Sequence, residues 1–337
     1  MKKAKNTYGA LRVSVVLSVL FAILIILCLI SIAVGSAGYS IPEIMREIMK
    51  EENNPVKVIV MNLRLPRILL AIMIGACLSA SGALLQSVMK NPLADPGTIG
   101  VSSGAATVAS TILLLFPTMT GSLPVFAFIG AGLACLLIYS MAWKNGVDPT
   151  RIILSGVAIN SVLGAYTALL QLLNSDSLQG VLAFLNGSLS GKSWYQVRIL
   201  SIYAGIGLVF AFCCVKNANA LQLGDEMAKS LGINVNISRI MLSAVAAFLA
   251  ASTVAVAGII GFVGLVVPHI ARILVGSNYK VMIPVSIVLG ADVLLFADTI
   301  GRTIVPGMEI PVGIVMAVSG GPFFLYMLRK KGGRYGN

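Results

Sequence analysis

The chain alternates between long runs of apolar residues and short polar segments over nearly its whole length. An apolar run of about 20 residues is long enough to cross a lipid bilayer as an α-helix. Ten runs are candidates for such helices, and they cover residues 11–36, 67–90, 98–116, 124–142, 152–173, 195–215, 240–260, 263–276, 281–301 and 312–328. The pattern predicts an all-α polytopic membrane protein with one transmembrane domain over residues 1–337.

The composition supports a membrane protein and explains the charge. Hydrophobic residues make up 58% of the chain and charged residues only 11%, against about 25% charged residues in soluble domains. The net charge of +12 would suit a nucleic-acid-binding protein, but membrane proteins also concentrate Lys and Arg in cytoplasmic loops. With the predicted spans, sixteen of the 24 basic residues lie on one side. This bias predicts both termini in the cytoplasm and no nucleic-acid partner.

Two polar residues lie inside predicted spans. Asp292 lies deep in the ninth run, where a carboxylate costs about 2.5–3.5 kcal/mol on insertion scales. We expect a hydrogen-bonded structural residue facing the bundle interior; an ion relay, which would make the chain a secondary transporter, is the alternative. His269 follows Pro268 in the short eighth run. One histidine makes no metal site, so we expect a packing or hinge role in a half-helix or a re-entrant segment.

The stretch from Arg64 to Gly104 is the most informative part of the chain. Two arginines flank a proline, an apolar run follows, and the turn from Asn91 to Gly97 contains two prolines. The glycines and serines of the run suit close helix packing, and the prolines end the helix. We therefore predict an inner helix that ends at a constriction.

The same stretch carries the motifs RLPR, GACLSASGALLQ and NPLADPGTIGVSSG. It closely resembles the membrane permeases of bacterial ABC importers for ferric siderophores, haem and cobalamin, and the resemblance extends over almost the whole chain. The resemblance implies the type II ABC importer fold and a location in the bacterial cytoplasmic membrane. It also implies a dimer with a second permease copy or paralogue, a separate cytoplasmic ATPase dimer that binds the ATP, and an extracytoplasmic binding protein. The permease itself would catalyse no bond chemistry and hold no cofactor. The motif NPLADPGTIG favours a ferric siderophore; haem and cobalamin remain alternatives.

The longest predicted cytoplasmic loop, 216–239, contains a short helix signal. Asp225 can cap a helix start, Glu226 suits the first turn, and Gly232 can end the helix. From the residues alone this is a capped surface helix. The resemblance implies that the segment is a coupling helix seated in a groove of the ATPase, formed by Gly224, Asp225, Glu226, Met227, Ala228, Leu231 and Gly232.

Two further groups of residues are candidates for the translocation path. Asn91, Pro92 and Leu93 resemble the cytoplasmic gate of the family, where a polar residue and a leucine from each subunit close a pore by steric and dewetting effects; a plain helix-ending turn is the alternative. The fifth run adds small and polar residues, which suit a path surface or a helix seam equally. They are Ser155, Gly156 and Asn160.

Three arginines lie on the predicted outer side, where basic residues are scarce. Arg64 and Arg67 precede the second span, and Arg302 ends the ninth. They can anchor to lipid phosphates, with Arg302 also reaching Asp298 one turn earlier. The resemblance implies instead that they dock acidic residues of the binding protein, which is the role that we expect.

Four other segments carry weaker signals. We expect an amphipathic outer helix over 41–52 and a short cap around 181–185. The segment Gly187–Ser193 has one residue too few between its glycines for a phosphate-binding loop. Gly100–Gly104 matches G-x-S-x-G but lacks the strand–turn–helix setting of a hydrolase. An intramembrane serine hydrolase is therefore only a remote alternative.

Overall fold

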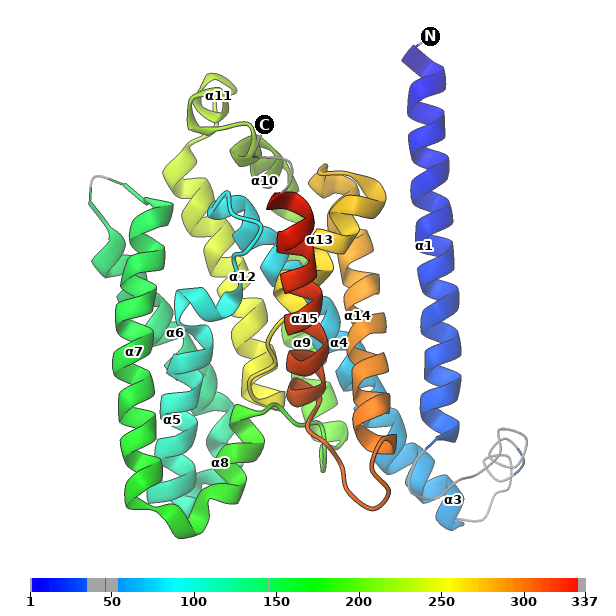
Figure 1. Cartoon of the computed structure of the whole chain (residues 1–337), viewed down its shortest axis with the longest axis vertical. Helices are drawn as coiled ribbons and strands as arrows, with labels where there is room; N and C mark the ends of the chain where they lie inside the picture. The colour runs from blue at the N-terminus through cyan, green and yellow to red at the C-terminus, as the bar shows by residue number, and fades with distance from the viewer. Residues whose placement is uncertain (1, 35–45, 47–53, 145, 333–337) are drawn as a thin grey trace.

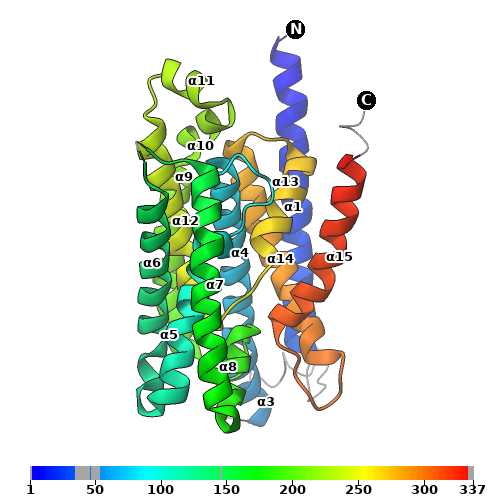
Figure 2. The same cartoon turned by 60° about the vertical axis from the view of Figure 1, so that its left-hand side comes forward.

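The computed structural model describes residues 2–34, 46, 54–144 and 146–332 as a bundle of helices, most of which run along one axis (Figures 1 and 2). Within these described ranges, seven helices are long and apolar enough to cross a membrane, and three more contain shorter apolar stretches of 10 to 17 residues. The first group contains α1 (Lys2–Ala33), α4 (Leu65–Val88), α6 (Leu123–Ala142), α7 (Pro149–Leu173), α9 (Trp194–Cys213), α12 (Val235–Ala257) and α14 (Tyr279–Thr303). The shorter ones are α5 (Val101–Leu115), α13 (Val263–Val275) and α15 (Val312–Gly332).

Short helices connect these spans. They are α3 (Pro55–Val58), the π-helix η1 (Ile59–Arg64), the 3₁₀-helices η2 (Pro96–Ile99), η3 (Pro117–Ser122) and η4 (Ser175–Ser177), and the α-helices α8 (Leu178–Leu185), α10 (Val215–Gln222) and α11 (Asp225–Ser230). Within the described part of the chain, strand-like pairing is limited to one isolated bridge, between Trp143 and Val147.

Each of the ten predicted runs coincides with one of the apolar helices, so the all-helical polytopic fold is confirmed. Some ends differ. α12 begins five residues earlier than expected, because the Asn234 side chain accepts a hydrogen bond from the Ile237 amide at 3.1 Å and caps the helix. Helical structure also precedes the second run, from Pro55 through α3 and η1 into α4. The predicted outer helix at 41–52 lies, apart from Arg46, outside the described residues.

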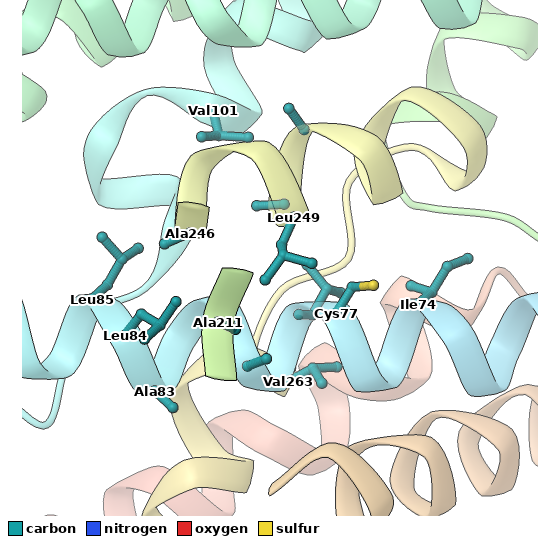
Figure 3. Close-up of a cluster of buried hydrophobic side chains, with 14 of the residues drawn as sticks. Ile74, Cys77, Ala83, Leu84, Leu85, Val101, Ala211, Ala246, Leu249 and Val263 are labelled. Carbon is teal, nitrogen blue, oxygen red and sulfur yellow. The ribbon is translucent and has the colours of Figure 1, made fainter. Parts of the chain in front are cut away.

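α4 lies at the centre of the bundle and packs against α12, α13 and α14. Small residues permit this packing. A Cβ atom on Gly75 would lie 2.1 Å from the Gly290 carbonyl oxygen on α14, and one on Gly82 would lie 1.9 Å from the Gly264 oxygen on α13. Figure 3 shows side chains of α4, including Ile74, Cys77 and Leu84, among those of the surrounding helices. The predicted close packing of this run is therefore confirmed.

The eighth run forms α13, which is only 13 residues long and follows a break in regular structure after α12. Gly258 has a φ of 78° and Phe262 a φ of 68°. The backbone of the break is bonded to the segment after α8: the Ile259 amide donates to the Phe184 oxygen at 2.9 Å, and the Ser188 amide to the Ala257 oxygen at 2.8 Å. Irregular backbone at membrane depth is tolerated when it is buried in protein in this way. The short helix after this break agrees with the expectation that the eighth run is less than a full span.

Different elements lie at the two ends of the bundle. The first residues of α1, the last residues of α15 and the α10–α11 segment lie at one end, and α3, α8 and the loop between α14 and α15 lie at the other (Figure 1). We call these the α11 end and the α8 end. α1 stands at the edge of the bundle and packs mainly on α14 (Figure 1).

Candidate functional site

The predicted short helix in the longest loop is present as α11, which projects from the bundle (Figure 1). Gly224, with a φ of 105°, begins it, and Gly232, with a φ of 75°, follows its end. Met227 is 55% exposed and Leu231 58% exposed, whereas Ala228 is buried. α11 therefore presents two apolar side chains to its surroundings.

Asp225 fixes the base of α11 to the bundle. Its carboxylate accepts hydrogen bonds from Lys90 Nζ at 2.6 Å and from Arg239 Nη2 at 3.0 Å. Partial desolvation raises the pKa of Asp225, but the two cations outweigh that effect and hold the pKa below its ordinary value. Asp225 was expected to cap α11, which is wrong: Gly224 is the N-cap residue, and the Asp225 side chain links α11 to α12 and to the end of α4.

The Asn91–Pro92–Leu93 turn follows α4 at the same end of the bundle. The Asn91 Oδ1 atom accepts a hydrogen bond from the Leu93 amide at 2.9 Å, and the Leu93 side chain is 40% exposed. Lys90, directly before this turn, is the partner of Asp225. One ion pair therefore joins α11 to the end of α4, directly before this turn.

The predicted residues of α7 pack against the segment that follows the turn. The Asn160 Nδ2 atom donates to the Gly97 carbonyl oxygen at 3.1 Å, and its Oδ1 atom accepts a hydrogen bond from Ser103. A Cβ atom on Gly156 would lie 2.2 Å from the Thr98 oxygen. Asn160 and Gly156 thus form a helix seam, one of the two expected alternatives, while Ser155 is half-buried.

The three arginines expected on the outer side gather at the α8 end around one buried carboxylate. Arg67 binds Asp298 through Nε at 3.1 Å and Nη2 at 3.0 Å, and Arg302 Nε lies 3.3 Å from the other Asp298 oxygen. Arg64 Nη1 donates to the Ala33 oxygen at 3.1 Å and also to the Ile32 oxygen. Arg302 also donates to Ser31, near the end of α1. The expected contact between Arg302 and Asp298 is confirmed.

The orientation expected for these arginines is wrong. Arg64 and Arg67 are 6% and 9% exposed, so their side chains point into the helix bundle. A buried carboxylate is stable only when it is paired and hydrogen-bonded, so Asp298 accounts for the burial of Arg67. Arg64 is held instead by backbone oxygens near the end of α1. Arg67 makes one outward contact, because its Nη1 atom binds Glu309 at 2.8 Å and the Glu309 side chain is 47% exposed.

Comparison with known proteins places this arrangement in a family. The FecCD transport family matches residues 23–330. The chain is 39% identical over 326 residues to the Fe(3+)-citrate import system permease protein YfmE of Bacillus subtilis, covering 96% of this chain and 98% of that protein. This chain belongs to the FecCD transport family.

Two further matches agree with this family assignment. The cobalamin import system permease protein BtuC of Halobacterium salinarum is 41% identical over 276 residues, which is 82% of this chain and 74% of that protein. A solved structure of a metal-chelate type ABC transporter in an inward-facing conformation superposes with a TM-score of 0.83 at 27% identity, covering 93% of this chain and 98% of that one. The chain is therefore a permease subunit of an ABC importer and not an enzyme.

Three expected residues of this FecCD permease, Asp292, Pro268 and His269, lie apart from these groups. Asp292 is 5% exposed in α14, and neither carboxylate oxygen has a hydrogen-bond partner among the described residues. The expectation of a hydrogen-bonded aspartate is therefore wrong for this part of the chain. Pro268 and His269 are buried in α13. Within the described ranges, no group of three or more His, Cys, Asp or Glu side chains is arranged to hold a metal ion.

Sequence reasoning missed the partners of the charged residues. Lys90 and Arg239 hold Asp225, and Glu309 holds Arg67. The one signal for these contacts is the position of Lys90 directly before the predicted gate. Nothing in the sequence around Glu309 indicates its partner.

Proposed function

We propose that this permease carries a ferric chelate of the siderophore type across the bacterial cytoplasmic membrane, with both termini in the cytoplasm. The observation that carries the proposal is the similarity to YfmE over nearly the full length of both chains, since YfmE is named for ferric citrate import. A bulky chelate suits a helical path in which no described cluster of side chains is arranged to hold a bare ion.

Cobalamin is the second candidate, because BtuC of Halobacterium salinarum is 41% identical over the part that it shares with this chain. Iron is favoured because the YfmE match extends over more of both proteins.

In the proposed mechanism two permease copies enclose the path, as a two-fold dimer would. Closure of the ATPase pair on ATP pushes α11, whose exposed Met227 and Leu231 are the proposed contacts. The Asp225–Lys90 pair passes the displacement to the turn at Asn91–Leu93, and the helices rock between outward- and inward-open states.

The α8 end is the proposed docking face for the binding protein. Asp298 holds Arg67 and Arg302 in place at this end of α4 and α14. Glu309 occupies the outward side of Arg67. A carboxylate of the binding protein can replace Glu309 there, so docking and the position of the α14–α15 loop are linked.

Uptake into proteoliposomes tests the substrate. The permease is reconstituted with its ATPase and its binding protein, and ferric citrate, a ferric hydroxamate, haem and cobalamin are compared. We expect ATP-dependent uptake of ⁵⁵Fe from a ferric chelate and slower uptake of labelled cobalamin. Preferred uptake of cobalamin contradicts the iron proposal, and uphill uptake without the ATPase contradicts the ABC mechanism.

A further inference from the structure

An apolar groove lies between α6 and α12 in their α11-end halves, with a volume of about 340 Å³. The polar groups along it bind within the chain: the Tyr139 hydroxyl and Ser243 Oγ form a hydrogen bond, and Ser140 Oγ donates to the Leu137 oxygen at 2.8 Å. Leu136 and Ile240 are exposed beside it. The lining of the groove therefore suits an apolar ligand.

A second cavity, of about 470 Å³, lies beyond the α11 ends of the same two helices. Its basic residues are Lys144, Lys229 and Arg239. Its two carboxylates are engaged, because Asp225 binds Lys90 and Arg239, and Asp148 caps α7 by accepting from the Arg151 amide at 2.9 Å. Lys144 and Lys229 are exposed and have no ion pair among the described residues. The cavity therefore has two ammonium groups available for an anion.

The turn after α6 joins the groove to the cavity. Trp143 lines the groove and Lys144 lines the cavity. Trp143 pairs with Val147, whose carbonyl oxygen accepts from Arg239 Nη1 at 2.7 Å and whose amide donates to Asn236 at 3.1 Å. Trp143 is 53% exposed, and tryptophan is enriched where hydrocarbon meets the headgroups. The groove therefore lies at acyl-chain depth and the cavity at headgroup depth.

We propose that the groove and the cavity together bind one anionic phospholipid, with an acyl chain between α6 and α12 and its phosphate at Lys144 and Lys229. An apolar surface followed at the interface by two exposed ammonium groups that have no ion pair among the described residues matches the two parts of such a lipid. The headgroup lies beside the Asp225–Arg239 pair that holds α11. A lipid at this site also stabilises the base of α11. This part of the proposal rests on the proposed coupling role of α11.

Quenching of Trp143 fluorescence by brominated lipid tests this proposal without measuring transport. The chain has two tryptophans, and Trp194 lies in α9 at the α8 end, bonded to the Met61 oxygen. The full-length Trp194→Phe protein is placed in vesicles of brominated phosphatidylcholine, and unbrominated phosphatidylglycerol is added stepwise. We expect phosphatidylglycerol to protect Trp143 beyond its mole fraction, with a preference of about 5-fold for each lysine engaged.

Charge variants distinguish lipid binding at this site from the general attraction of anionic lipids to a basic protein surface. In the same background, Lys144→Gln with Lys229→Gln should reduce the preference to about that of phosphatidylcholine. Lys216→Gln, an exposed lysine of α10 outside both cavities, should leave it unchanged. Equal protection by both lipids overturns the proposal, as does the same loss with Lys216→Gln. A Trp143 that no brominated lipid quenches also overturns it, because protein then covers the groove.

Discussion

Asp298 explains why the arginines at the α8 end point inward. Its side chain is 1% exposed and lies between Arg67 of α4 and Arg302 of α14. Leaving one partner of a buried ion pair alone costs about 3–5 kcal/mol, so both arginines are needed in place. The sequence suggests the Arg302 contact, one helical turn away, but not the Arg67 contact, because that partner is 231 residues distant. Because the sequence does not reveal this distant partner, it predicts exposed arginines where the structure has inward-facing ones.

Glu309 is the residue through which the docking proposal is best tested. Partial burial raises its pKa, but Arg67 outweighs that effect and lowers it, so the side chain carries a negative charge at neutral pH. Glu309→Gln removes a charge that competes with the carboxylates of the binding protein. The association rate should rise roughly 2- to 5-fold at low salt, the effect of about 0.5–1 kcal/mol, as measured by surface plasmon resonance.

The control is Asp176→Asn, another exposed carboxylate near the α8 end, which has no ion pair within the described residues. It should change the rate less than Glu309→Gln does. Rates and salt dependence that are the same for all three proteins count against docking at Arg67.

At the scale of elements, the apolar runs predict the spans well because nine of the ten runs have 17 or more residues, enough for a bilayer crossing. The short α13 was also predictable, since glycines and Pro268 interrupt its run. The apolar runs do not predict which sides of a helix are buried against other helices. α4 is buried on nearly all sides and α7 is largely exposed, yet both are apolar, because lipid and protein interior favour the same side chains.

α11 is the element whose role is most open to direct test. Met227→Ser with Leu231→Ser removes its two exposed apolar contacts and should change the free energy of unfolding by less than about 1 kcal/mol. Transport should fall much more than ATP hydrolysis, because the ATPase would close without moving the permease. Both rates are measured in the same proteoliposomes.

The matched control is Met308→Ser, which alters a methionine of similar exposure in the loop at the α8 end. It should retain normal coupling. A double variant of α11 that keeps the wild-type ratio of transport to hydrolysis would exclude α11 as the ATPase contact.

At the scale of the whole molecule, a path between two copies requires a surface on which they meet. α7 exposes large apolar side chains, among them Leu154, Val157 and Val162, and it packs against the 96–99 segment that follows the Asn91–Leu93 turn in the chain. A two-fold axis near α7 would bring the two Leu93 side chains towards each other. We infer that they form the gate at the α11 end.

A disulfide between two copies of Leu93→Cys tests both the dimer and the gate. The five natural cysteines, Cys28, Cys77, Cys135, Cys213 and Cys214, are first replaced by Ala or Ser. Two cysteines form a disulfide only when their Cα atoms approach within about 7 Å, so crosslinking should be efficient in the state with the gate closed and weak in the inward-open state. Leu223→Cys, exposed at the same end but after α10, should crosslink poorly in every state. If Leu93→Cys gives no dimer without nucleotide, with ATP or in a vanadate-trapped complex, these residues do not meet across the path, and closure at this end depends on other residues.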